Sequence, residues 1–161
     1  MDNLDSFDLK ILSALQDDSR ISMIDLAERV GLSPTPCTRR IKRLESEGYI
    51  DRYVTLLNPE KLSAGLSAFV NIRLRSQTSD AFDRFDSEIA QMPEVVGCYL
   101  LAGSFDYLLQ VRVADVDAFR EFMRNRLTAM QGVTETQSSI VLQQLKHTTA
   151  IPLPRNHASR R

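Results

Sequence analysis

Residues 21–50 read ISMIDLAERVGLSPTPCTRRIKRLESEGYI and predict two short helices joined by a glycine turn. Ser22 is placed to cap the first helix and Gly31 to end it, since serine favours the N-cap and glycine the left-handed position after a helix. Ser33 is placed to cap the second helix, and Gly48 to end it. Two short helices joined in this way are typical of the helix-turn-helix.

The second of these helices carries a basic face. A rotation of about 100° per residue puts Cys37, Ile41 and Leu44 on one side and mostly polar or basic residues on the other. Residues 34–44 include four basic residues and no acidic one, which makes the exposed side positive. The sequence therefore predicts a surface for double-stranded DNA, with these candidate residues: Ser33, Pro34, Thr35, Arg39, Arg40, Lys42 and Arg43.

We predict that Arg39 or Arg43 contacts base edges, because a recognition helix offers its outward side chains to the major groove. Ser33 and Lys42 are expected nearer the phosphates. The alternative is a solvated basic helix on an ordinary helical bundle, and a run of charges alone would favour it. The capped first helix, the tight turn and the proline at the start of the second helix favour DNA recognition.

Composition narrows the class of protein. The chain has 161 residues, of which 43% are hydrophobic and 25% charged, with a net charge of −1, so DNA contact requires a local patch that symmetry would double. The two cysteines and two histidines have no metal-ligand spacing, and no motif pairs a nucleophile with a base. We therefore expect no metal, no cofactor and no catalytic residue. No signal peptide or membrane-spanning run is apparent, which predicts a cytoplasmic protein.

The rest of the chain predicts two domains and a tail. A helix that begins at Asp5, with Asp8 completing a capping box, adds a third helix to the DNA-binding domain, residues 1–56. A strand is expected over Tyr49 to Leu57, followed by a linker at residues 57–66. Residues 152–161 are expected to form a basic flexible tail.

Residues 67–151 predict an α+β domain. The patterns favour strands at 68–75, 95–102, 107–113 and 134–145, with helices at 79–92 and 116–130. This βαββαβ order is the ferredoxin-like arrangement, with helices on one face of an antiparallel sheet.

The strand at residues 95–102 is apolar in both registers. Val96, Cys98 and Leu100 would point to one side, and Val95 and Tyr99 to the other. Helices cover one face only, so an apolar face would remain open to water, and a second copy across a two-fold axis would cover it. The alternative is that tail residues cover that face.

The chain resembles the Lrp/AsnC, or feast/famine, family of transcription regulators over nearly its whole length. The motifs that carry the resemblance are LDSFDLKILSALQDDSRIS, LAERVGLSPTPCTRRIKRLESEGYI, GSFDYLLQVRV and GVTETQSSIVLQQLKHTTAIPL. Membership implies a winged-type helix-turn-helix joined to a domain that binds amino acids. It also implies dimers that assemble into octamers or related rings, and operator binding modulated by an amino-acid effector.

The resemblance places the effector site around the hairpin at residues 103–106, at a contact between dimers. The residues implied are Leu100, Gly103, Ser104, Asp106, Val116 and Ser139, with Ile140 and Val141 beside them. Gly103 would let backbone N–H groups face the carboxylate of the ligand, and Asp106 would hold its ammonium group. The alternative is ordinary turn chemistry, with Asp106 bonded to the backbone. Leucine is the first candidate effector and methionine the second.

Two other classes of protein stay open. Ferredoxin-like domains that bind amino acids also occur as regulatory subunits of metabolic enzymes. The βαββαβ order is shared with RNA-binding RRM domains, but YLLQVRV lacks the aromatic pattern that RRM strands use for stacking on bases.

Overall fold

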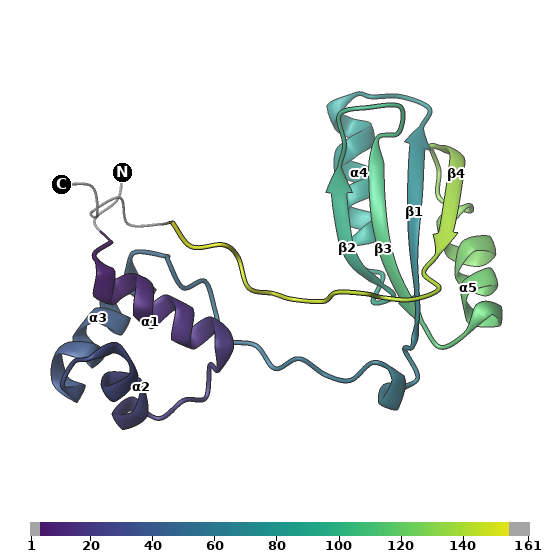
Figure 1. The fold of residues 1–161 in the computed structure, drawn as a ribbon. Helices are drawn as coiled ribbons and strands as arrows, with labels where there is room; N and C mark the ends of the chain where they lie inside the picture. The colour runs from purple at the N-terminus through teal and green to yellow at the C-terminus, as the bar shows by residue number, and fades with distance from the viewer. Residues whose placement is uncertain (1–3, 155–161) are drawn as a thin grey trace. The chain divides into compact units, whose positions relative to one another are not determined.

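The computed structural model describes residues 4–154, which form two compact units. The first unit, called the head, comprises residues 4–56 together with residues 146–154. The second, called the sheet unit, comprises residues 57–145 (Figure 1). The chain therefore passes from the head to the sheet unit and back again.

The head contains three helices, α1 (Ser6–Asp17), α2 (Met23–Val30) and α3 (Pro34–Ser46). The expected capping box is present, because Asp5 accepts the backbone N–H of Asp8 and the Asp8 side chain accepts that of Asp5. Gly31 ends α2 in the left-handed conformation, with φ of 78°. The helices pack around a core formed by Ile11, Leu12, Ala14, Leu26, Ala27, Val30, Cys37, Ile41 and Leu44.

The strand expected over Tyr49 to Leu57 is wrong. This segment forms no strand and pairs with none in the part of the chain that the structure describes, and a lone strand has no ladder to stabilise it. The segment is tied to α3 instead. The N–H groups of Tyr49 and Ile50 donate to the carbonyl of Leu44, and the Tyr53 hydroxyl donates to Glu45. Burial and the Glu45 carboxylate raise the pKa of Tyr53 to about 12.

The sheet unit has the expected βαββαβ order. Its elements are a 3-10 turn η1 (Glu60–Leu62), β1 (Leu66–Leu74), α4 (Ser79–Ile89), β2 (Val95–Leu100), β3 (Tyr107–Val113), α5 (Val116–Phe122), a π-helical turn η2 (Met123–Leu127) and β4 (Val133–Ile140). The strands lie in the order β2-β3-β1-β4 and every pairing is antiparallel (Figure 1). The final strand ends at Ile140, earlier than the predicted 134–145.

The helices cover one face of this sheet. Alternate residues of β1 and β3 point to them, and the pattern along β3 from Tyr107 to Val113 alternates between buried and half-buried. These side chains form one core with Phe85, Ile89, Phe119, Phe122 and Leu127. Tyr107 contacts Phe85 at 4.4 Å between ring centroids.

The opposite face differs from the open apolar surface that the sequence predicts. A register shift between Val95 and Gly97 puts Val95 on the same face as Cys98, so the expected split of β2 residues is wrong. Pairing register leaves three apolar side chains at the centre of the uncovered face, Phe69, Leu108 and Tyr99. Polar side chains surround them, namely Asn71, Gln110, Gln137 and Ser139. The face is therefore mixed, because β1, β3 and β4 contribute polar side chains to it and the bulge removes Val95 from it.

The chain end returns to the head. The prediction placed residues 67–151 in one domain, whereas residues 146–154 group with the head, where Ile151 bonds Gln16 of α1. Leu153, expected in a flexible tail, packs against the core of the head. The remainder of that predicted tail, residues 155–161, lies outside the described residues.

Candidate nucleic-acid interface and effector loop

The outer side of α3 is exposed and basic. Thr35, Arg39 and Lys42 are exposed, while Cys37, Ile41 and Leu44 face the core of the head. Neither Arg39 nor Lys42 makes an ion pair within residues 4–154. Two cationic side chains therefore stand on the helix surface without an acidic neighbour to neutralise them.

The N-terminus of α3 adds polar groups to this surface. Ser33 adopts the extended backbone of an N-cap, but its side chain makes no capping hydrogen bond. Pro34 occupies the first turn, where its missing N–H costs nothing. The free N–H groups of a helix N-terminus and the Ser33 hydroxyl suit an anion such as a phosphate.

Two other arginines of α3 point to α1 instead. Arg40 donates to Asp5 at 2.7 Å and to Asp8 at 2.9 Å, and Arg43 donates to Asp8 at 2.5 Å. Asp8 is completely buried, so both of its oxygens depend on these cations and on the capping box for hydrogen bonds. The pKa of Arg40 is raised by its hydrogen bond to Asp8 and then by that to Asp5, which favours its charged form.

This cluster, Asp5, Asp8, Arg40 and Arg43, joins the recognition helix to the first helix of the head. Burial acts to raise the pKa of Asp5, but the hydrogen bonds from Asp8 and Arg40 outweigh it and the pKa is lowered. The helical periodicity of α3 could have indicated that Arg40 is partly turned toward the core of the head. Arg40 lies only about 60° from Cys37 around α3, on the edge of its buried side.

The hairpin between β2 and β3 contains the predicted effector loop. Leu101 N–H donates to the Asp106 carbonyl at 2.8 Å, and Asp106 N–H donates to the Ile72 carbonyl at 2.9 Å. Arg73 lies over the Phe105 ring, 5.2 Å from its centroid, and pairs with Glu135 at 3.3 Å. These contacts fasten the hairpin to the ends of β1 and β4.

The Asp106 side chain is buried and already bonded. Its two carboxylate oxygens accept the Leu74 N–H at 2.7 Å and the Gln77 side-chain amide at 2.8 Å. The turn-chemistry alternative is met in part, since Asp106 bonds a backbone group, but that group is Leu74 on the neighbouring strand β1, 32 residues earlier in the sequence. Gly103 does not adopt a left-handed backbone, and a Cβ at this position would meet no heavy atom within 4 Å.

The predicted effector residues do not gather within one chain. Leu100 lies on β2 and Ser139 on β4, at opposite edges of the sheet, three strand spacings or about 14 Å apart. Val116 starts α5 after the far end of β3, away from the hairpin. A ligand that contacts the hairpin and Ser139 together therefore requires more than one copy of the chain.

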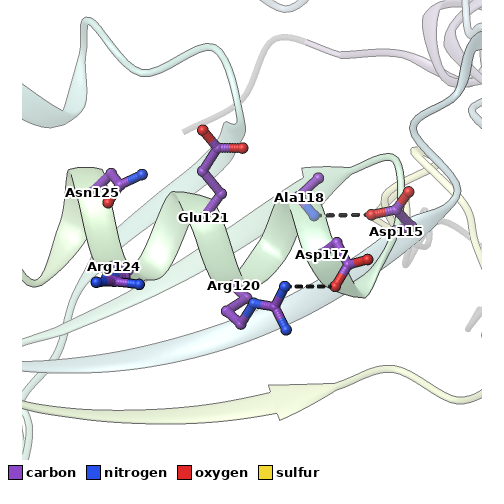
Figure 2. A pocket seen from close by; sticks show the side chains of 7 residues that line it. All are labelled: Asp115, Asp117, Ala118, Arg120, Glu121, Arg124 and Asn125. Carbon is purple, nitrogen blue, oxygen red and sulfur yellow. Dashed lines mark hydrogen bonds and ion pairs between the residues drawn. The ribbon is translucent and has the colours of Figure 1, made fainter.

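A hollow of about 520 Å³ lies on α5 (Figure 2). Among its charged side chains, Asp117 pairs with Arg120 at 3.0 Å and Asp115 accepts the Ala118 N–H at 2.9 Å. Val116 does not line it. The hollow therefore brings together none of the predicted effector residues.

Residues 4–154 contain no group of three or more histidine, cysteine or acidic side chains that could hold a metal ion. Over the same residues, no helix has the length and hydrophobicity needed to cross a membrane. Partial burial and then the Asp86 carboxylate raise the pKa of Cys98 to about 11, although the residue as a whole is exposed.

The comparisons with known proteins agree with these two units. The family model for the Lrp/AsnC ligand binding domain matches residues 67–151, and the model for a winged helix-turn-helix DNA-binding domain matches residues 4–51. The chain belongs to the Lrp/AsnC family. The leucine-responsive regulatory protein of Escherichia coli is 42% identical over 149 residues, which cover 92% of this chain and 91% of the relative.

Solved structures of Lrp/AsnC regulators have the same fold. A transcriptional regulator from Neisseria meningitidis in complex with L-methionine has a TM-score of 0.90 and 43% identity, covering 93% of this chain and 97% of its own. A feast or famine regulatory protein from Mycobacterium tuberculosis, complexed with L-methionine, has a TM-score of 0.79 and 34% identity over 92% of this chain and 98% of its own.

These findings confirm the predicted fold class and the main functional prediction. The protein is an Lrp-like DNA-binding transcriptional regulator with an amino-acid ligand-binding domain. The family consists of transcriptional regulators rather than enzymes, which favours this function over a regulatory subunit of an enzyme.

Proposed function

We propose that the outer row of α3, formed by Thr35, Arg39 and Lys42, contacts DNA, while Arg40 and Arg43 hold the helix in place. The observation that carries this division is the pairing of Arg40 and Arg43 with buried Asp8, next to the unpaired Arg39 and Lys42. An arginine already bonded to a buried carboxylate would have to give up that bond to reach a base. Arg39 is therefore our candidate for a base contact, and Ser33, Pro34 and Lys42 for the phosphate backbone.

Arg39→Ala is expected to weaken binding to the operator by about 1–3 kcal/mol and to relax specificity at one position. Lys42→Ala is expected to weaken binding to all DNA sequences, since one phosphate contact is lost. For the same reason, the slope of log affinity against log salt concentration, called the salt slope, should fall by about one in magnitude. Fluorescence anisotropy titrations of labelled duplexes at several salt concentrations measure both effects.

Lys61→Ala is the matched control, because Lys61 is an exposed cation in the sheet unit. If Arg39→Ala and Lys42→Ala both bind DNA with the affinity and the salt slope of the parent protein, the proposed interface is refuted.

We also propose that a free amino acid regulates this protein. The support is the ligand-binding family match and the L-methionine bound in two similar regulators, together with relatives named as leucine-responsive. Leucine and methionine are the candidate effectors. The spread of Leu100, Asp106 and Ser139 over one chain favours a site completed by a neighbouring copy.

Self-association is part of this proposal, as a dimer that assembles further into an octamer or another ring. The uncovered sheet face has an apolar centre, Phe69, Leu108 and Tyr99, inside a polar border, which is the usual anatomy of an interface. Tyr99 is 52% exposed, and its ring lies over Gly97, where a Cβ would come within 3.0 Å of the hydroxyl oxygen. A second copy would cover this centre.

Tyr99→Glu is expected to shift the protein to smaller species in sedimentation velocity, because it places a charge at the centre of the apolar patch. Leu142→Glu is the control, since Leu142 is 98% exposed outside the sheet. The same distribution of species for Tyr99→Glu and the parent protein would exclude this face as the interface.

A further inference from the structure

The C-terminal segment, residues 146–154, is attached to α1 by a two-bond clamp. The Gln16 side-chain amide donates to the Ile151 carbonyl at 3.2 Å, and the Ile151 N–H donates to the Gln16 carbonyl oxygen at 2.7 Å. Both polar atoms of the Gln16 amide thus bond the backbone of a single residue, Ile151. Beyond it, Leu153 is half-buried against the core of the head.

The sequence of this segment suits such an attachment. Pro152 and Pro154 flank Leu153 and hold the backbone extended, since proline restricts its own φ and the conformation of the residue before it. A segment that is already extended loses little conformational entropy when it binds. The restricted backbone therefore lowers the entropic cost of holding the segment against the head.

The same segment is anchored at its other end in the sheet unit. Val141 N–H donates to the Ser67 carbonyl at 2.9 Å, directly after β4 ends at Ile140. Between this bond and Ile151 the side chains of Leu142 and Leu145 are 98% and 86% exposed, so the intervening chain is not packed. Ten residue steps span at most about 36 Å when fully extended, which limits how far α1 can move from the end of β4.

We infer that the C-terminal segment is a second tether, which runs from β4 to the clamp on α1 and restricts the orientations of the DNA-binding head. The first connection is the chain that leads from α3 to β1. A body held by one flexible connection can turn about it, whereas a body held by two turns much less. The Asp8 cluster joins α1 to α3, so restraint on α1 also acts on the recognition helix.

The tether links the end of β4 to α1, so a movement of β4 would act on the head. Ser139 lies next to the end of β4, two residues before the Val141 anchor. An amino acid that moves this end of β4 would change the distance that the ten-residue connection has to span to reach the clamp. This use of the tether rests on the proposed effector function, whereas the restraint itself needs no ligand.

The test compares the full-length protein with and without the clamp. A dye is attached through Glu28→Cys on the exposed side of α2, in a Cys98→Ser background that removes the exposed native thiol. Gln16→Ala removes the clamp without touching the core, and alanine is a good helix former. Leu153→Ser removes the apolar contact, and Leu142→Ser is the control in the same segment.

Hydrogen exchange measured by mass spectrometry and time-resolved fluorescence anisotropy give independent readouts. In Gln16→Ala, the Ile151 amide is expected to exchange about fivefold faster, which corresponds to the loss of one hydrogen bond. The anisotropy decay of the head is expected to gain a faster component in Gln16→Ala and Leu153→Ser, and to stay unchanged in Leu142→Ser.

Faster exchange at Ile151 with an unchanged anisotropy decay would overturn the tether, because the contact would exist without restraining the head. If neither the exchange rate of the Ile151 amide nor the anisotropy decay changes in Gln16→Ala, the clamp itself is overturned. Neither readout uses DNA or an amino acid, so the result is independent of the proposed function. A later comparison of DNA affinity with and without L-methionine or L-leucine tests whether the coupling factor falls toward one when the clamp is removed.

Discussion

Asp8→Ala is expected to lower the free energy of unfolding of the head by about 3–5 kcal/mol, the cost of breaking a buried ion pair from one side. Asp8 is completely buried, and its loss would leave Arg40 and Arg43 without a common partner. Without Asp8, Arg40 would keep its hydrogen bond to Asp5, but Arg43 would keep only a long ion pair to Glu47, 3.9 Å from its Nε, and that Nε makes no hydrogen bond within the described residues. Denaturant titrations followed by circular dichroism at 222 nm measure the change.

The matched control is Asp17→Ala on the same helix. Asp17 pairs with Arg29, but the two side chains are 59% and 47% exposed, so we expect a loss of no more than about 1 kcal/mol. Similar small losses in the two variants would show that the Asp8 cluster does not stabilise the head. A large loss for Asp8→Ala would also predict that Arg40→Ala and Arg43→Ala weaken DNA binding through the head's stability, without either side chain touching DNA.

Asp106→Ala is expected to destabilise the sheet unit by about 2–3 kcal/mol. The change leaves the Leu74 N–H without an acceptor in the buried end of β1, and it removes the partner of the Gln77 amide. A loss of amino-acid response in this variant would therefore report damage to the hairpin as well as loss of a ligand contact. Thermal denaturation of the unliganded protein measures the first effect.

Asp106→Asn separates these two roles. Asparagine keeps one carbonyl oxygen for the Leu74 N–H, so most of the stability should remain, but it has no charge to attract an ammonium group. The melting temperature is then measured with L-methionine and with L-leucine, since a ligand that binds the folded state raises it. A full ligand-induced shift in Asp106→Asn would rule out an ammonium contact, and an Asp106→Ala variant as stable as the parent would rule out the structural role.

Much of the fold was predictable because its signals are local. The capping box of Asp5 and Asp8 and the left-handed Gly31 depend on residues a few positions apart, and the structure contains both. Apolar residues alternate with other residues along β1 and β3, which indicates strands with one buried face. The βαββαβ order could therefore also be predicted. The strand predicted after α3 was wrong, because a strand-like sequence pattern forms a strand only where a partner strand is available.

The sequence by itself determined the order of most helices and strands, which family the chain resembles, and that α3 has a basic side. Only the tertiary structure decided which of those basic residues remain available, because the packing of α1 against α3 brings Asp8 to Arg40 and Arg43. It likewise decided that Asp106 bonds Leu74 on another strand, and that Gln16 holds Ile151 from the far end of the chain. Such pairs are distant in sequence, and hydrophobic periodicity carries no information about which polar groups meet when helices and strands pack together.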